Sequence, residues 1–181
     1  TAVPKEGYKF VRWEGTVNST DISIQYNMET AGNFTAIFAE ATVEDISIVI
    51  NEINYNSSPE RDTKDWVELV NNGVSTVDLN GWLLSDSGPD SGYFFLEGTK
   101  LVPGQYLVVC KNLDDFRDFN PGVTNSIGDM PFGLSSNGDM LRLYDDQSNV
   151  MDAVDYYVYN PWPENANGTG ASIELKDPSL D

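Results

Sequence analysis

Alternating apolar and polar positions mark short strands in the first forty residues. Three runs, Tyr8–Trp13, Ile22–Tyr26 and Asn33–Phe38, interleave aromatic or β-branched side chains with polar ones. A period of two is typical of strands with one face buried and the other in solvent. Gly, Asn and Ser separate the runs and favour turns. We therefore expect three strands in this part of the chain.

The pattern changes after Thr42. Ile46–Ile53 is a nearly continuous β-branched run, as expected of a strand buried on both faces. Gly81 lies inside a later run and indicates a bulge. The further strand candidates are Trp66–Val70, Thr76–Leu84, Tyr93–Leu96, Gln105–Cys110, Met140–Tyr144, Val150–Tyr157 and Ala171–Leu175. Strands at this spacing, separated by turn residues, predict an all-β sandwich or barrel.

One helix is predicted, directly after the run that ends at Cys110. Asn112 can cap it, and Asp114 and Asp115 would lie near its positive N-terminal end. Leu113 and Phe116 are three residues apart and share a face. Pro121 and Gly122 then stop the helix after about two turns. We expect a connector or a lid on the sandwich rather than a framework element.

Composition and charge narrow the function classes. Ten basic residues against 29 acidic ones give a net charge of −19, which disfavours binding to nucleic acids and to anionic membranes. No apolar stretch is long enough to span a bilayer. The chain has no histidine and one cysteine, Cys110, which excludes histidine-based nucleophile activation, internal disulfides and multi-cysteine zinc sites. We expect no cofactor, no bound metal and no catalytic residue, and we expect Cys110 to be a small buried hydrophobe.

Two glutamates interrupt strands that are otherwise largely apolar, Glu52 and Glu68. Burying a carboxylate is costly unless it is paired or hydrogen-bonded. The favoured interpretation is that each points to solvent or accepts hydrogen bonds from the backbone amides of a loop. The alternative is a pair that converges on a cation such as calcium. A carboxylate glycosidase would need such a pair across a cleft, and the sequence locates no cleft.

Several loops carry oxygen ligands at alternate positions, as calcium loops do. The segment from Asp86 to Gly92, which includes Asp90, is the most extended of them, but it lacks the terminal Glu of an EF-hand. Similar fragments are Asp145-Asp146 with Asn149 and Asp62 with Asp65. Because Asp, Asn, Ser and Gly also favour turns for local reasons, we expect turns here, with calcium binding by Asp86 or Asp90 as the alternative.

Aromatic residues crowd the stretch before Pro163: Tyr156, Tyr157, Tyr159 and Trp162. Such a cluster can form a platform on which sugars stack. It can also pack against the end of the sandwich with its hydroxyl and indole groups at the wet edge. Packing is the favoured interpretation, and a binding surface is the alternative.

Residues 43–181 resemble a bacterial lamin tail domain. Each motif that carries the resemblance is weak alone, but together and in order they are specific. The motifs are Ile50-Asn51-Glu52-Ile53, Asp65-Trp66-Val67-Glu68-Leu69, Asn71-Asn72, Val77-Asp78-Leu79-Asn80-Gly81-Trp82, Leu84-Ser85-Asp86, residues 102–109, residues 133–139, Asp152-Ala153-Val154-Asp155-Tyr156, Pro161-Trp162-Pro163 and residues 170–175. The resemblance implies an immunoglobulin-like β-sandwich and a non-enzymatic module of exported bacterial proteins. Nuclear lamins share that fold, but their basic nucleic-acid contacts have no counterpart in this acidic chain.

Residues 1–41 resemble the second half of a divergent internalin-B-type repeat, as found in Listeria and Bacteroides surface proteins. The resemblance rests on Pro4, Gly7-Tyr8-Lys9-Phe10, Trp13 and Phe34-Thr35-Ala36-Ile37-Phe38. Because repeats of this family begin earlier, we expect that part of the repeat is missing. The chain also starts at Thr1 rather than at a methionine, and we expect it to be a piece of a longer protein.

Together these observations predict a non-catalytic accessory or structural module of a larger bacterial surface or secreted protein, located outside the cell. Its role would be domain spacing, anchoring or adhesion. Its partners would be neighbouring domains of the same polypeptide, and protein or glycan ligands at the surface. The alternative function is a carbohydrate- or calcium-dependent binding module.

Overall fold

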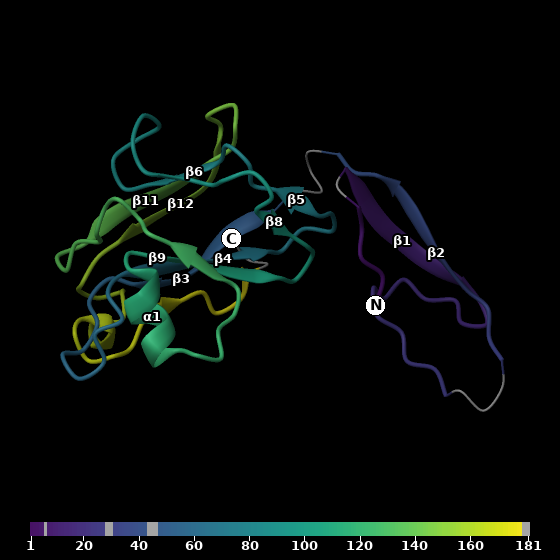
Figure 1. Cartoon of the computed structure of the whole chain (residues 1–181), viewed down its shortest axis with the longest axis horizontal. Helices are drawn as coiled ribbons and strands as arrows, with labels where there is room; N and C mark the ends of the chain where they lie inside the picture. Colours follow the sequence, from purple (N-terminus) through teal and green to yellow (C-terminus); the bar gives the residue numbers. More distant parts are fainter. Residues whose placement is uncertain (6, 28–30, 43–46, 179–181) are drawn as a thin grey trace.

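A computed structural model describes residues 1–5, 7–27, 31–42 and 47–178. Figure 1 shows two β units: a broad layered body formed by the later residues and a slender hairpin unit formed by residues 1–42 that projects from one end of it. The two units differ in how much they bury. Among the described residues of the hairpin unit, only Ala2 and Pro4 are buried.

The hairpin unit is built on two antiparallel strands, β1 (Tyr8–Gly15) and β2 (Phe34–Glu40). The register shifts between Phe10 and Arg12, which is the signature of a bulge. The predictions for Tyr8–Trp13 and Asn33–Phe38 are confirmed. The third predicted strand, Ile22–Tyr26, is wrong: this segment is a bend and an extended loop.

The missing third strand has a local reason. Ile22 is held to the hairpin by one backbone bond, from the Ala2 amide to the Ile22 carbonyl at 2.8 Å. Tyr26 meets Phe34 through an edge-to-face ring contact with centroids 5.0 Å apart. The side chains of Ile22–Tyr26 alternate as in a strand, but among the described residues the segment has no neighbouring strand with which to form backbone hydrogen bonds, so it is not a strand.

The layered body is a sandwich of two sheets. The strands of the five-stranded sheet, in spatial order, are β10 (Ser126–Gly128), β9 (Tyr106–Cys110), β4 (Trp66–Asn71), β3 (Ile48–Asn54) and β13 (Ile173–Glu174). Those of the four-stranded sheet are β12 (Val150–Tyr156), β11 (Asp139–Tyr144), β6 (Leu83–Ser85) and β7 (Tyr93–Phe94). A small ribbon pairs β5 (Val77–Asp78) with β8 (Lys100–Leu101). All pairings are antiparallel except that of β10 with β9.

The hydrophobic core fills the space between the two sheets. Alternate residues of the facing strands meet there, among them Val67, Leu69, Leu84, Leu141 and Leu143, all fully buried. Tyr55 stacks on Tyr156 within this layer, with ring centroids 4.9 Å apart. The prediction of an all-β, immunoglobulin-like sandwich is confirmed. β3 is buried along nearly its whole length, as the β-branched run predicted; Ile46, the first residue of that run, lies outside the described residues.

Some predicted strands are shorter than expected. Thr76–Leu84 is not one strand but two, β5 and β6, separated by a turn. Gly81 lies in that turn with φ +76°, so the predicted bulge at Gly81 is wrong. β8 and the parallel strand β10 were not predicted, and a 3-10 helix follows at Glu164–Ala166.

The predicted helix is present as α1 (Leu113–Phe119). The Asn112 side chain accepts a hydrogen bond from the Asp115 amide at 3.0 Å, which is the expected cap. Phe116 is buried against Val108 and Cys110 on the outer face of the five-stranded sheet, with Leu113 beside it. The helix is therefore a lid on that face, as predicted.

The two units meet at the turn between β4 and β5. Thr76 donates a hydrogen bond from its hydroxyl to the Pro4 carbonyl at 2.5 Å, and Lys9 forms an isolated bridge with Ser75. Asn71 holds this turn to the sandwich, because its buried amide donates to the carbonyls of Ser75 and Leu101, both at 2.8 Å. The hairpin unit thus touches one end of the sandwich and does not cover a sheet face (Figure 1).

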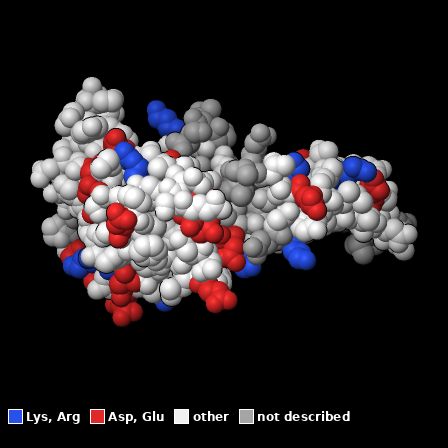
Figure 2. Space-filling model, turned by 90° about the horizontal axis from the view of Figure 1, so that it is seen from above, with Lys and Arg blue, Asp and Glu red and all other residues white. Residues whose placement is uncertain are grey.

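Charge is also distributed unequally. The first 41 residues carry a net charge of −2 and the remainder −17. Figure 2 shows acidic groups scattered over the visible face of the sandwich with few basic ones between them, whereas the hairpin unit presents both signs.

Candidate functional site

A bulge in β3 brings two polar side chains to the outer face of the five-stranded sheet. Ile50 is opposite Leu69 and Glu52 is opposite Glu68, so Asn51 is the extra residue. Two residues then oppose one on the partner strand. The Asn51 amide donates to Glu68 Oε1 at 2.9 Å. The bulge therefore supplies a donor to a carboxylate that would otherwise face only another carboxylate.

Three glutamates form a row across this face. Glu52 lies between Glu68 on β4 and Glu174 on β13 as direct cross-strand neighbours. Burial raises the pKa of Glu52; a hydrogen bond from the Ser172 hydroxyl works against the rise, while the charges of Glu68 and Glu174 add to it. Burial also raises the pKa of Glu68, against the bond from Asn51. Like charges directly opposite each other destabilise a sheet.

This arrangement differs from the favoured interpretation of the sequence. Glu52 and Glu68 accept hydrogen bonds from side chains rather than from loop amides, and both are partly buried rather than solvated. They do face each other, but no group of three or more acidic, histidine or cysteine side chains in the described part of the chain is arranged to hold a metal ion.

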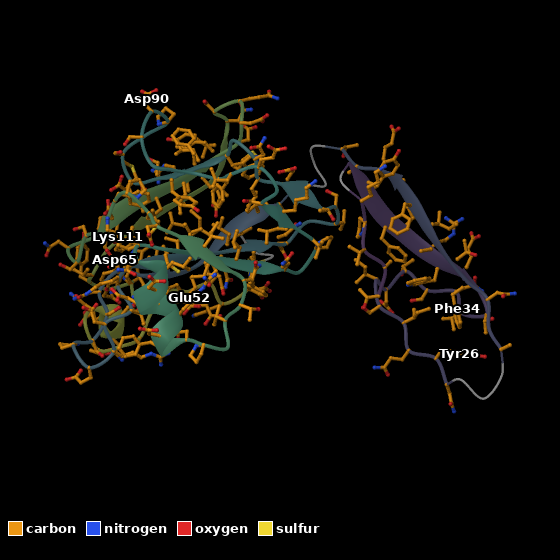
Figure 3. All side chains as sticks on the ribbon, in the orientation of Figure 1. Tyr26, Phe34, Glu52, Asp65, Asp90 and Lys111 are labelled. Atoms are coloured by element: carbon orange, nitrogen blue, oxygen red, sulfur yellow. The ribbon has the colours of Figure 1, made fainter. Side chains whose placement is uncertain are left out.

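A pocket adjoins Glu52 and reaches the end of α1; we call it the helix pocket. Its volume is about 190 Å³. Glu52 is marked beside α1 in Figure 3. The pocket is lined by Glu52, Asn54, Ser57, Arg61, Thr63, Trp66, Asn120, Gly170 and Ser172. It thus combines an indole, one carboxylate, one guanidinium and several neutral hydrogen-bonding groups.

Internal hydrogen bonds hold the walls of the helix pocket in place. The buried Asn54 amide donates to Ser57 Oγ and to the Lys64 carbonyl, both at 2.8 Å. The Trp66 indole donates to Thr63 Oγ1 at 3.2 Å, and its ring meets Phe116 edge to face with centroids 5.8 Å apart. The orientation of the Trp66 ring is therefore fixed from two sides before any ligand arrives.

Arg61 lines the helix pocket next to the end of α1. Its guanidinium donates to the Phe119 carbonyl at 3.2 Å and to the side-chain oxygen of Asn120. These acceptors lie at the C-terminal end of α1, where a cation is favoured by the helix dipole. Arg61 thus ties the turn between β3 and β4 to the helix, and the pocket lining as a whole carries one acid and one base.

The acidic loops form turns. In the loop after β6, the hydroxyl of Ser85 accepts the amides of Ser87 and Gly88 at 3.1 and 3.0 Å, while Asp90 lies far out on that loop (Figure 3). Thus Ser85, rather than Asp86 or Asp90, organises the loop. Asp145 accepts the amides of Gln147 and Asn149 at 2.9 and 2.8 Å and closes the hairpin of β11 and β12.

The two carboxylates of the remaining acidic fragment, Asp62 and Asp65, lie in different environments. Asp62 pairs with the Lys64 ammonium at the surface, which lowers the pKa of Asp62. Asp65 is partly buried and accepts the Leu134 amide at 2.8 Å; burial raises its pKa, while that bond and the nearby Lys111 charge work against the rise. Asp65 and Lys111 lie close together in Figure 3. Asp65 therefore holds a loop to the sheet.

The aromatic cluster divides between core and surface. Tyr156 is fully buried and donates to the Ser135 carbonyl at 2.9 Å, and Trp162 packs against the core. Tyr157 and Tyr159 are exposed, with ring centroids 5.4 Å apart. Packing accounts for two of the four side chains, and the other two form a small exposed pair.

Cys110 is fully buried under α1. Burial is the main cause that raises the pKa of its thiol to about 12. Since the thiolate is the reactive form, Cys110 is a packing residue, as predicted.

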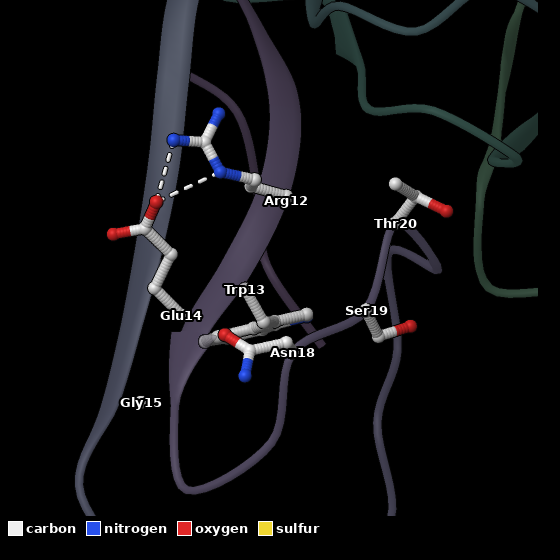
Figure 4. A pocket seen from close by; sticks show the side chains of 7 residues that line it. All are labelled: Arg12, Trp13, Glu14, Gly15, Asn18, Ser19 and Thr20. Atoms are coloured by element: carbon white, nitrogen blue, oxygen red, sulfur yellow. Dashed lines mark hydrogen bonds and ion pairs between the residues drawn. The ribbon is translucent and has the colours of Figure 1, made fainter.

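A second hollow lies in the hairpin unit (Figure 4). It is an open depression of about 740 Å³ lined by Arg12, Trp13, Glu14, Gly15, Asn18, Ser19 and Thr20. Arg12 Nε donates to Glu14 Oε1 at 2.8 Å along one side of it. Asn18 and Trp13 both line this depression, and the buried Trp13 Nε1 has no hydrogen-bond partner in the described residues.

Sequence reasoning singled out only Glu52 among the residues of the helix pocket. The pocket lining comes from three separate segments, residues 52–66, Asn120 and residues 170–172, and their meeting depends on strand order and on the position of α1. One signal was available: Asn54 and Trp66 each stand two residues from a glutamate, Glu52 and Glu68, and residues two apart on a strand share a face.

The two sheets, the lid helix and the projecting hairpin define a two-part, all-β protein of the immunoglobulin-like class. Comparison with protein-family models matches residues 42–158 to the Lamin Tail Domain, and the chain belongs to that family. Residues 1–42 match the Divergent InlB B-repeat domain. No curated protein and no solved structure matches the chain significantly.

The matches agree with both resemblances seen in the sequence. The two families are generally non-catalytic, and together they indicate a module of a larger protein. The InlB-type repeat indicates association with a surface. No helix in the described ranges is long and apolar enough to cross a membrane. The structure also extends the sandwich beyond residue 158, because β13 completes the edge of the five-stranded sheet.

Proposed function

We propose that the chain is a non-catalytic accessory module of an exported bacterial protein, in which it spaces, anchors or orients neighbouring domains and contributes to adhesion outside the cell. The observation that carries this proposal is the succession of an InlB-type repeat and a lamin tail sandwich in one chain. Its main partners are the neighbouring domains of the same polypeptide.

The chemistry of the described side chains supports a non-catalytic role. The helix pocket has one carboxylate, Glu52, whereas most glycoside hydrolases use two carboxylates across the scissile bond. The Cys110 thiol is buried and protonated at neutral pH. A nucleophile needs an adjacent base or a lowered pKa, and neither Glu52 nor Cys110 has that setting.

The acidic surface supports a role outside the cell. A net charge of −19 keeps a protein soluble and repels anionic polymers. The sandwich would therefore stay clear of anionic lipid and nucleic acid and present its loops to other partners.

Antibodies raised against the folded chain can test the proposed location on the bacterium that makes it. Intact cells or their culture medium should be labelled, and brief protease treatment of intact cells should remove the signal from the cells. Labelling that appears only after lysis would overturn the proposal. A cytoplasmic enzyme detected in the same samples controls for leakage.

Replacing residues 47–178 in the parent gene by a flexible Gly/Ser linker tests the proposed role. Cell attachment should fall, while any activity of the neighbouring domains, assayed in lysate, should persist. Unchanged attachment would argue against a role in adhesion or orientation.

A further inference from the structure

The helix pocket is a place where a small polar ligand could bind, and nothing in the family assignment accounts for it. It lies on the outer face of the sandwich, away from the core that the fold requires. Its lining joins one aromatic side chain, Trp66, to several polar and charged groups, and polar groups that converge on one pocket fix the orientation of a ligand. Its volume of about 190 Å³ is below the roughly 300–1,000 Å³ of sites for drug-sized ligands. The pocket therefore suits a small polar ligand, on the scale of one sugar ring rather than a chain of them.

The aromatic wall suits the apolar face of a sugar. Trp66 lines the pocket with its ring held by Phe116 and by the bond from its indole to Thr63. A large rigid aromatic surface offers contact area at low entropic cost. The C–H face of a pyranose ring is the matching surface on a neutral glycan.

The polar groups suit sugar hydroxyls. Glu52 has a hydrogen bond from Ser172 on one oxygen, which fixes the carboxylate towards the pocket wall. A carboxylate accepts strongly from hydroxyl donors. The hydroxyl hydrogens of Ser172 and Ser57 already bond Glu52 and the Lys64 carbonyl, and their oxygens keep lone pairs that can accept. Because most of these side chains are already held by hydrogen bonds within the protein, little side-chain entropy is lost on binding.

The charges disfavour an acidic ligand. Arg61 and Glu52 give the pocket one charge of each sign, and Arg61 is committed to the end of α1. Glu68 and Glu174 stand next to Glu52 on the sheet, so an acidic sugar would meet like charges. The overall charge of −19 acts in the same direction.

We propose that the helix pocket binds one neutral sugar residue, at the end or side branch of a glycan, between Trp66 and Glu52. This adds a ligand to the module and does not depend on its role in spacing domains. Binding would be weak for one ring, with a Kd near 1 mM equal to about −4.1 kcal/mol. Tight attachment would then arise from several copies acting together.

The test uses the whole chain, labelled with ¹⁵N, and NMR titration with methyl glycosides of glucose, galactose, mannose and N-acetylglucosamine. At least one should shift the Trp66 indole signal and the amides of residues 52–66 and 170–172, with saturation in the millimolar range. Glucuronate forms the acidic arm of the panel and should bind more weakly. Absence of saturable shifts at these residues with every neutral glycoside would overturn the proposal, as would stronger binding of glucuronate or shifts centred on Tyr157 and Tyr159.

Two matched variants locate the site. Glu52→Gln keeps the shape of the side chain and should weaken binding at least tenfold. Glu68→Gln makes the same chemical change one strand away, outside the pocket, and should leave the affinity within twofold of the original. Both variants should give spectra of a folded sandwich, so an equal effect of the two, or no effect of Glu52→Gln, would show that the pocket is not the site.

Discussion

The sandwich and the hairpin unit are stabilised by different interactions. The sandwich closes a continuous core between two sheets, with residues such as Leu69 and Leu141 fully buried. The hairpin unit places its aromatic side chains on a two-stranded ribbon, where Phe38 stays 38% exposed. Phe10 bridges that ribbon through ring contacts with Trp13 and Phe38. One unit is stabilised by burial, the other by a few ring contacts and the hairpin ladder.

This difference shows how little a strand pattern says about independent stability. A two-stranded hairpin is marginal in water, whereas three or more strands with a covered face can stand alone. The sequence predicts strands in both units. The sandwich buries a continuous core between two sheets, whereas the hairpin unit contacts the sandwich at one end.

Separating the two units should give the largest effect. A peptide of residues 1–42 should lack stable strand structure, because its described residues bury only Ala2 and Pro4. Residues 47–178 should fold with a cooperative transition. Circular dichroism during heating measures both. A cooperative melt of the isolated peptide would show that the ring contacts suffice and would remove the distinction drawn above.

Truncating one core side chain should have the next largest effect. Leu141→Ala should lower the free energy of unfolding of the whole chain by about 3–5 kcal/mol, because Leu141 is fully buried between the sheets. Phe38→Ala in the hairpin should change it by less than about 1 kcal/mol, since Phe38 is already partly exposed. Urea unfolding followed by core tryptophan fluorescence measures the difference, and similar losses in both variants would contradict it.

A substitution in the turn that joins the units should have an intermediate effect on the free energy of unfolding. Asn71→Ala should cost about 2–3 kcal/mol, because the buried carbonyls of Ser75 and Leu101 lose their donor. Asn72→Ala is the control: the neighbouring side chain is exposed and donates only to Pro178, so its loss should be under about 0.5 kcal/mol. Equal effects in urea unfolding would mean that Asn71 does not hold the turn.

A substitution in the row of Glu68, Glu52 and Glu174 should have a smaller effect on the free energy of unfolding, and it should stabilise rather than destabilise the sandwich. Glu68→Gln should stabilise the sandwich at pH 7 by up to about 1 kcal/mol, because it removes a charge directly opposite Glu52. A raised pKa means that the folded state holds the proton more tightly, so the destabilisation by Glu68 is absent below its ordinary pKa of 4.5 and grows as the pH rises through the raised pKa.

The gain from Glu68→Gln should therefore vanish near pH 4. Melting curves between pH 4 and 8 measure it. Glu97→Gln removes one charge from an exposed loop and controls for net charge. A gain for Glu68→Gln that matched the control, or that increased towards acid, would exclude the proposed cause.

Added calcium should have the smallest effect on the melting temperature. Asp145 uses its oxygens to close a hairpin, and Ser85 organises the loop that carries Asp86 and Asp90. Melts in calcium and in chelator should therefore coincide. A ligand at a hundred times its Kd adds about 2.7 kcal/mol and moves the midpoint by several degrees, so a shift of that size would make these turns calcium sites.

The fold could be predicted further than the site. Strand alternation, the cap at Asn112 and the buried run of β3 are local properties, and the structure has all three. Predictions failed where the formation of a strand depended on a neighbouring strand. Ile22–Tyr26 has an alternating sequence but, in the described part of the chain, no neighbouring strand to pair with. In contrast, β10 has no strand pattern of its own and forms a strand by pairing in parallel with β9.

The site depends on register, which the sequence does not display. Glu52 and Glu68 face each other only because Asn51 is inserted as a bulge. A straight ladder would have placed Asn51 opposite Glu68 and shifted Glu52 to the other side of the sheet. Ser172, 120 residues away in the chain from Glu52, reaches it only through the edge strand β13.

The pairing of β3 with β13 also determines how the sandwich transmits force. The two strands are antiparallel, with Ile173 opposite Ile53 and Glu174 opposite Glu52, so the chain enters β3 and leaves β13 at the same end of the sheet. A pull on these two ends loads the backbone bonds of the pair one after another, as in a zipper, instead of all together in shear. The short edge strand would peel away first, while Leu69 and the rest of the core stay closed. In a protein under tension the sandwich would thus give a little length at low load and recover it when the tension falls.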